Sequence, residues 1–306
     1  MTDGESRGNP FALPGAPEPR IGRYDVNGCR LYAEVRGAGP PVLIIGAASD
    51  DAEMFRPIAE RLSGFTVVTW DPRGTRRSGR EDWPCDSARH ADDAAVLLQV
   101  LGLSPAAVFG ASAGGIVALQ LALRHPSLVR RVLVYEPGYF RHTVRGGALH
   151  AQVNEAVRAY LRGHPDDWTG AMALVSQAAA ERTSEDGDAH PGTPAPGLLD
   201  APAGLEWYTE RGAVLAENFI RDDLPRTNET VPPEALTATA ADIRFAAGTD
   251  SPAVFREIAA ELTRLRRRPG TSDPRRPDSV PGAGHVAYFT PGPIADYIRR
   301  RCAALT

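Results

Sequence analysis

Ser112 is the residue of this sequence whose surroundings most clearly suggest chemistry. It lies in the segment VFGASAGG, residues 108–115, between two glycines and two alanines. A buried-strand pattern precedes it and a helical pattern follows, so the serine falls on a short strand-to-helix turn. Gly110 to Gly114 fit the pattern G-x-S-x-G, in which small neighbours let the backbone turn sharply and expose the hydroxyl. This pattern predicts a serine nucleophile; the alternative is a glycine-rich turn with an incidental serine.

A serine hydroxyl is a poor nucleophile unless a base lies in contact with it. The chain has seven histidines. His285 stands apart because its segment, GAGHVAYF, forms a loop beyond the last expected strand. His125 is interpreted as the end of a helix before Pro126. Five others lie in polar or loop segments and are interpreted as surface residues: His90, His142, His150, His164 and His190. We therefore expect His285 to be the base.

A serine and a histidine this far apart in the chain can meet only if the fold brings them together. Apolar runs typical of buried strands alternate with segments of helical periodicity, which predicts an α/β fold with a doubly wound, mostly parallel sheet. An Asn27-Gly28 pair predicts a hairpin within residues 23–36. Further strands are expected at 41–46, 65–71, 106–109, 130–138 and 242–248, with a short final strand at the start of SVPGAGHVAYF, residues 279–289. Helices are expected at 52–62, 88–101, 115–124 and 292–304.

The regular alternation stops between residues 138 and 240. We interpret this segment as a helical cap inserted between two strands, with helices near 146–162, 167–182 and 205–221 and a Gly- and Pro-rich loop at 183–197. The core domain then comprises 23–137 and 241–306, and residues 1–22 form a flexible tail. Aromatic and apolar cap residues are expected to shape a pocket for a hydrophobic substrate of medium size: Tyr139, Phe140, Trp168, Met172, Trp207, Tyr208 and Phe219.

Composition excludes several kinds of chemistry. The sequence contains no lysine, which rules out a Schiff-base lysine and a Walker A lysine. The net charge of −4 offers no electrostatic basis for binding nucleic acid or a membrane surface. No apolar run approaches the ~18 residues of a membrane helix, and the first twenty residues lack the pattern of a secretory signal. Three widely spaced cysteines, Cys29, Cys85 and Cys302, fit a reducing compartment. We expect a cytoplasmic protein.

Six segments together resemble those of α/β-hydrolase-fold proteins and follow that family's order along the chain: VLIIGA, VVTWDPRGTRRSG, VFGASAGG, VLVYEPG, FAAGTDSP and PGAGHVAYF. The resemblance extends from about residue 23 to the end of the chain. It implies a catalytic triad in the order Ser, acid, His, which Ser112 and His285 fit. It also implies an oxyanion hole from the backbone N–H groups of Ala47 and Ala113.

The resemblance leaves two candidates for the triad acid. Asp250 follows the expected strand at 242–248, where the family most often carries the acid, although the spacing is one residue short. Glu136 follows the preceding strand, a place that some family members use. Either carboxylate could orient the imidazole and stabilise the imidazolium.

These observations favour a serine hydrolase that cleaves a carboxylic ester, thioester or lactone through an acyl-enzyme. No metal or organic cofactor is implied, and the expected partner is a small-molecule substrate, with the oligomeric state left open. Two alternatives remain: a lyase, cyclase or cofactor-free perhydrolase that acts on a biosynthetic intermediate, and a ligand-binding protein without catalysis on the same scaffold.

Overall fold

The computed structural model describes residues 9–185, 205–268, 270 and 274–303, with only the backbone described for 178–185. An eight-stranded sheet runs through the centre in the order β1-β2-β4-β3-β5-β6-β7-β8. β2 pairs antiparallel with β1 and β4, and all other neighbours pair in parallel. The predicted doubly wound, mostly parallel sheet is thereby confirmed. The strands are Arg20–Val26, Cys29–Arg36, Pro41–Ile45, Thr66–Trp70, Ala106–Ala111, Val129–Tyr135, Asp242–Gly248 and Asp278–Val280.

Helices cover both faces of the sheet because the central strands are apolar on both sides. α2 (Ser87–Val100), α3 (Ala113–Arg124) and α9 (Ala253–Arg266) pack in one hydrophobic cluster. α1 (Arg56–Glu60) and α10 (Pro291–Cys302) pack in a second cluster on the other face. Residues 41–45 of β3 illustrate the cause: Val42 and Ile44 belong to one cluster, and Leu43 and Ile45 to the other.

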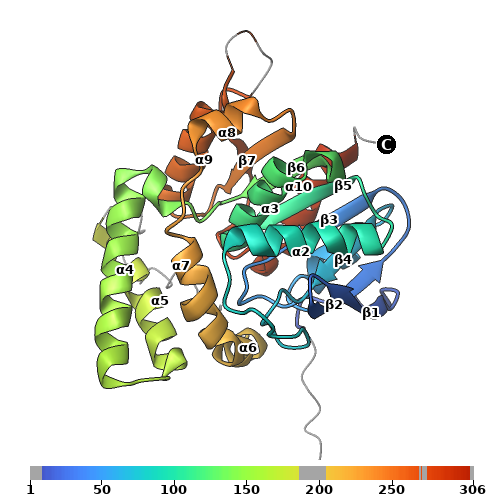
Figure 1. Cartoon of the computed structure of the whole chain (residues 1–306). Helices are drawn as coiled ribbons and strands as arrows, with labels where there is room; N and C mark the ends of the chain where they lie inside the picture. The colour runs from blue at the N-terminus through green and yellow to red at the C-terminus, as the bar shows by residue number, and fades with distance from the viewer. Residues whose placement is uncertain (1–8, 186–204, 269, 271–273, 304–306) are drawn as a thin grey trace, which may run out of the picture.

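The segment between β6 and β7 is helical, as the sequence predicts. α4 (Val144–Gly163) and α5 (Trp168–Glu185) lie side by side at one end of the molecule, on the left in Figure 1. α6 (Glu206–Asn218) continues through a π-helical turn (Phe219–Asp223) into α7 (Leu224–Arg226). α8 (Pro233–Ala238) lies against α9 instead of against the other inserted helices (Figure 1). Most of the Gly- and Pro-rich loop at 183–197 falls outside the described residues.

Residues 9–22 are not the free tail that the sequence predicts. Asn9 is buried, its amide donates to the Glu53 carbonyl at 2.8 Å, and its side-chain oxygen accepts from the Tyr208 hydroxyl at 3.1 Å. Phe11 packs against the Tyr208 ring, and residues 20–22 belong to β1. Asn9 and Phe11 make these contacts as single side chains, so the segment has no hydrophobic periodicity from which the sequence could predict them. Residues 1–8 lie outside the described part of the chain.

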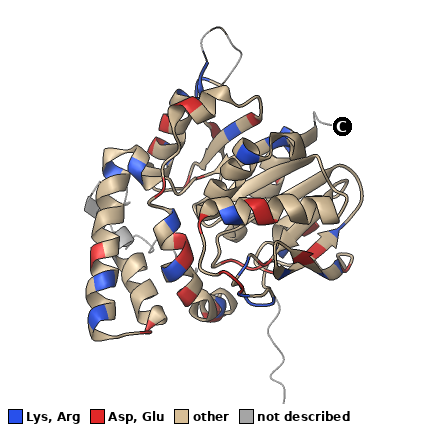
Figure 2. Ribbon diagram, in the orientation of Figure 1, with Lys and Arg blue, Asp and Glu red and all other residues tan. Residues whose placement is uncertain are grey.

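Charged side chains of both signs are spread over the outer helices, α4 and α9 among them (Figure 2). Among the described residues, the helices are all too short or too polar to cross a bilayer.

Candidate active site

Ser112 occupies a sharp turn between β5 and α3. Its backbone has φ 52° and ψ −121°, in the positive-φ region that an L-residue rarely adopts. The turn is held on both sides, since the Ser112 N–H donates to the Tyr135 carbonyl at 3.0 Å and the Ser112 carbonyl accepts from Gly115 and Gly138. Strain of this kind persists only where the surroundings enforce it and is commonly associated with functional sites.

The two glycines of the motif are required by close packing. A Cβ atom on Gly114 would lie 2.4 Å from the carbonyl oxygens of both Ile45 and Gly46. A Cβ atom on Gly110 would lie 2.5 Å from the Gly114 carbonyl oxygen. Backbone atoms cannot move aside as a side chain can, so this turn accepts only glycine at these two positions. The glycines beside Ser112 therefore allow α3 to pack closely against the end of β3.

His285 contacts Glu136, one of the two acids that the sequence left open. The Nδ1 atom of His285 lies 2.8 Å from Oε2 of Glu136, and the Glu136 side chain is fully buried. The other carboxylate oxygen accepts from the Gly248 N–H at 2.7 Å and from the Ser251 hydroxyl. The imidazole stacks on Phe255 at a centroid distance of 3.8 Å. Hydrogen bonding and stacking together hold the ring in one orientation.

The structure does not bring Asp250 to His285. Asp250 is exposed, and its carboxylate accepts from the neighbouring Thr249 hydroxyl at 2.9 Å. Its backbone N–H donates to the Ala283 carbonyl, so the loop after β7 is tied to the loop that carries His285 through the main chain. Asp250 thus contacts this region through its backbone, whereas Glu136 reaches the histidine through its side chain.

Ser112 and His285 line one cavity of about 490 Å³. Among the described residues no hydrogen bond joins the two side chains, which share the cavity wall in this conformation. Such bonds are often longer in an unliganded site than in a substrate complex. The segment inserted between β6 and β7 contributes Met172, Tyr208 and Phe219 to the lining of this cavity. The predicted cap residues Trp168 and Trp207 do not line this cavity, and Tyr139 is fully buried.

The two expected oxyanion donors differ in their present partners. Ala113 is the first residue of α3, where a backbone N–H has no acceptor within the helix. The Ala47 N–H, by contrast, already donates to Oδ2 of Asp50 at 3.0 Å. Ala113 follows Ser112 in the chain and Ala47 lines the same cavity, but the Ala47 N–H already has an acceptor.

Two carboxylates that the sequence analysis did not identify accept hydrogen bonds from the loop after β3. Asp223, in the π-helical turn of the cap, accepts from the Ala48 N–H at 2.7 Å and from the Ser49 N–H at 2.8 Å. Burial raises the pKa of Asp223 to about 6, although these hydrogen bonds oppose the shift. Burial, followed by the charge of Asp223, raises the pKa of Asp50 to about 7. No motif marks either residue. Asp223 contacts a loop distant in the sequence, and Asp50, although close to Ala47 in the chain, is buried by distant segments such as the one with Tyr288.

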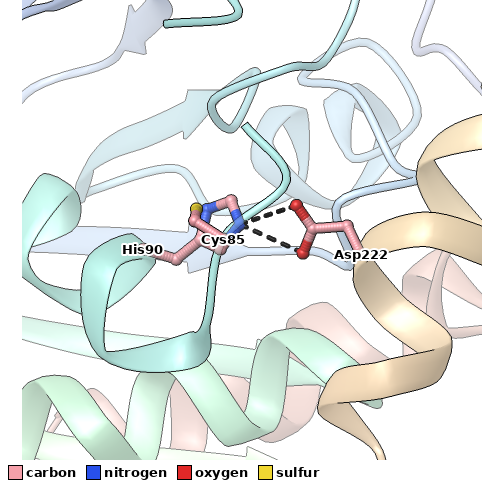
Figure 3. A group of neighbouring side chains, drawn as sticks. All are labelled: Cys85, His90 and Asp222. Atoms are coloured by element: carbon pink, nitrogen blue, oxygen red, sulfur yellow. Dashed lines mark hydrogen bonds and ion pairs between the residues drawn. The ribbon is translucent and has the colours of Figure 1, made fainter. Parts of the chain in front are cut away.

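A cluster of three side chains near α2 has atom types that can bind metals. In the part of the chain that the structure describes, Cys85, His90 and Asp222 have potential ligand atoms within 4.8 Å of one another (Figure 3). His90 Nε2 faces the Asp222 carboxylate at 3.1 Å, while Arg226 is paired with the same carboxylate. Burial also raises the pKa of the Cys85 thiol to about 11. A divalent cation would meet a guanidinium and a protonated thiol here, so we interpret the group as a link between α2 and the cap.

Comparisons with known proteins place the chain in a family. Residues 40–195, about half of the chain, match the family described as alpha/beta hydrolase fold. The protein therefore belongs to the α/β-hydrolase fold family, as the sequence motifs predicted. Among solved structures, an esterase from Thermogutta terrifontis aligns with a TM-score of 0.67 at 17% identity, covering 94% of this chain and 99% of that one. A putative lipase from Acinetobacter baumannii gives a TM-score of 0.68 at 14% identity, covering 94% and 92%. At such identities the likeness shows the fold alone.

Similar curated proteins are named as hydrolases. An uncharacterized hydrolase, YraK, of Bacillus subtilis is 37% identical over 121 residues, which are 38% of this chain and 44% of that protein. The putative carbamate hydrolase RutD of Azorhizobium caulinodans is 35% identical over 143 residues, 44% of this chain and 53% of that protein. The human serine hydrolase BPHL is 31% identical over 141 residues, 40% and 48% of the two chains. The chain spans about half the length of the curated relatives it matches.

Proposed function

We propose that this protein is a serine hydrolase that cleaves a carboxylic ester, with thioesters, lactones and carbamates as related substrates. The observation that carries the proposal is the common cavity wall formed by Ser112, on its strained turn, and by His285, held by Glu136. The names of the relatives support the same class, and RutD adds the carbamate to the carbonyl substrates considered.

The proposed mechanism follows from which imidazole nitrogen is free. Because Nδ1 of His285 faces the Glu136 carboxylate, Nδ1 carries the proton and Nε2 is the basic atom. Nε2 takes the proton of the Ser112 hydroxyl as Oγ attacks the substrate carbonyl carbon. The Glu136 carboxylate stabilises the imidazolium that forms, and its own charge is already held by Gly248 and Ser251.

The acyl-enzyme then forms and breaks down with the same groups. The imidazolium gives its proton to the departing alcohol, and the acyl group stays on Ser112 Oγ. A water molecule loses a proton to Nε2 and attacks the acyl carbon, after which the proton returns to Ser112. The Ala113 N–H at the start of α3 would stabilise the oxyanion in both steps, together with Ala47 once that donor is released.

The test is covalent labelling by a fluorophosphonate probe followed by ester kinetics. We expect wild-type protein to be labelled at Ser112 and to hydrolyse short-chain p-nitrophenyl esters, and Ser112→Ala and His285→Ala to lose turnover while unfolding cooperatively. If Ser112→Ala hydrolysed the ester at the wild-type rate, the assignment of Ser112 as the nucleophile would be wrong.

A ligand-binding protein without catalysis is the second candidate, favoured by the engaged Ala47 N–H. It predicts that neither labelling nor turnover occurs while ligands still bind the cavity.

A further inference from the structure

Asp50 is an acidic group in a cavity where His285 is the one basic side chain among the described lining residues. Of the described residues that line the cavity, Asp50 is the one carboxylate, and neither lysine nor arginine is among them. The walls around it are mostly apolar, from Met54 and Phe55 on the sheet domain to Phe219 on the cap. A cavity of this composition is complementary to a ligand with an apolar body and a positive group.

The charge of Asp50 has no cationic partner among the described residues, unlike that of its acidic neighbours. Asp51 is paired with Arg76 at 2.9 Å and with Arg211 at 3.2 Å. Asp223 is paired with Arg226 at 3.0 Å. The contacts of the Asp50 side chain are the Ala47 N–H at 3.0 Å and the Tyr288 hydroxyl at 3.3 Å. A buried carboxylate gains most from a partner of opposite charge, and none of the described residues supplies one to Asp50. A positively charged ligand would supply it.

Asp50 also lies close to where the reacting carbonyl would be. Its Oδ2 atom is 3.0 Å from the Ala47 nitrogen, the expected donor to the oxyanion. A donor to an oxyanion lies ~2.9 Å from it, so Oδ2 and the carbonyl oxygen are separated by at most ~6 Å. A positive group bound to Asp50 is therefore only a few bonds away from the carbonyl carbon.

From these contacts we propose that the substrate is an amino ester, with an ammonium group one to three carbons from the carbonyl carbon, and that Asp50 binds this ammonium. The proposal rests on the proposed hydrolase function. In the free protein Asp50 occupies the Ala47 N–H and places a negative charge beside the site of the oxyanion. The substrate ammonium draws the carboxylate away, so the Ala47 N–H becomes available to the carbonyl oxygen. A neutral ester of the same shape leaves that donor occupied.

This arrangement affects kcat as well as KM. Attraction between ammonium and carboxylate strengthens binding of the amino ester, which lowers KM. Release of the Ala47 N–H acts on the transition state, and one such donor is typically worth a factor of ~10²–10³ in kcat. A residue that merely supported the loop after β3 would alter the turnover of charged and neutral esters equally.

The experiment compares ethyl β-alaninate with ethyl butanoate, which have the same shape and differ in an ammonium against a methyl group. At pH 8 we expect the wild-type protein to favour ethyl β-alaninate at least tenfold in kcat/KM, with part of the difference in kcat. Asp50→Asn should lose most of this preference. Asp50→Ala should lose it too and turn over ethyl butanoate faster than wild type, because its Ala47 N–H is no longer occupied. Asp296→Asn, an exposed carboxylate on α10 paired with Arg299, serves as the control of equal charge change.

A binding measurement separates this inference from the proposed function. In Ser112→Ala, calorimetry should show ethyl β-alaninate binding at least tenfold more tightly than ethyl butanoate, and the double variant with Asp50→Asn should bind the two alike. Equal affinity in Ser112→Ala, or an unchanged preference in Asp50→Asn, overturns the inference even if ester hydrolysis is found. Tight binding of the amino ester without hydrolysis by wild type supports ammonium binding by Asp50 and refutes both the proposed function and the amino ester as a substrate.

Discussion

Glu136 and His285 lie in hydrogen-bond contact at 2.8 Å although 149 residues separate them in the chain. Glu136 sits just beyond the end of β6 with a positive φ of 46°, and its N–H donates to the Ala246 carbonyl of β7 at 2.8 Å. This conformation turns the side chain across the end of β7 towards the loop that carries His285. The longer side chain of glutamate suits this path, since it must pass β7 to reach the imidazole.

The two carboxylates considered for the triad should differ sharply on substitution. Glu136→Gln should lower kcat by ~10⁴, the effect of a wrong imidazole tautomer in serine proteases. Asp250→Asn should change kcat less than about twofold, because the exposed Asp250 carboxylate is bonded to Thr249. Ester kinetics on both variants, with thermal unfolding to confirm the fold, checks this. Equal small losses would reduce the site to a Ser–His pair.

Gly114→Ala should destabilise the protein and abolish labelling of Ser112. The new Cβ would meet the Ile45 and Gly46 carbonyls at 2.4 Å, so α3 or β3 must shift, at a cost of about 2–4 kcal/mol. Gly147→Ala is a matched control, since Gly147 lies within α4 and a Cβ there meets nothing within 4 Å. That change should raise stability by about 0.5–1 kcal/mol. Urea unfolding measures both free energies.

Asp223→Asn should lower kcat by ~10–10² while the apparent affinity for substrate changes less. The amide retains one acceptor oxygen for the N–H groups of Ala48 and Ser49 and loses the ion pair with Arg226, so the loop that carries Ala47 shifts. The melting temperature should fall as well. Steady-state kinetics beside the Asp296→Asn control measures the effect; an unchanged kcat would show that the loop keeps its shape without the Asp223 carboxylate.

Asp50→Asn should stabilise the protein at pH 8 and have little effect at pH 4. The folded-state pKa of Asp50 is raised to about 7, so between pH 4 and 7 the folded protein binds more protons at this site than the unfolded chain does. Stability contributed by this site therefore falls as the pH rises through that window. The other titratable groups that face Asp50 are present in both the wild type and the variant: Asp51, Asp223, Tyr208 and Tyr288. We expect a gain of about 1–3 kcal/mol at pH 8 by urea unfolding; a gain of the same size at pH 4 would contradict the titration of Asp50.

Phe219→Ala and Trp207→Ala should separate specificity from stability in the cap. Phe219 lines the cavity, so its loss should change the ratio of kcat/KM between short and long acyl esters by about tenfold. Trp207 is 7% exposed, packs edge-on against Tyr208 and lies under the Arg211 guanidinium. Its removal should cost about 3–5 kcal/mol with little change in that ratio. A panel of acyl chain lengths together with thermal unfolding tests both.

Local sequence was sufficient to predict the elements and the turn at Ser112. The apolar runs of β3, β5 and β6 indicate strands covered on both faces, and the glycines around Ser112 reflect contacts within one strand-turn-helix unit. These features depend on neighbours in the chain, which is why periodicity and a short motif reveal them. The position of the cap helices was predictable for the same reason.

Only the tertiary structure distinguished Glu136 from Asp250 and revealed Asp50 and Asp223. Both candidate acids follow parallel strands and reach the same edge of the sheet, so chain order cannot tell which side chain points at His285. Asp223 reaches the loop after β3 from 175 residues away, because the cap folds back over the sheet. Asp50 is three residues from Ala47, yet its importance comes from a cavity whose other wall is the cap. A carboxylate in a polar loop looks like a solvated surface residue until the packing that removes its water is known.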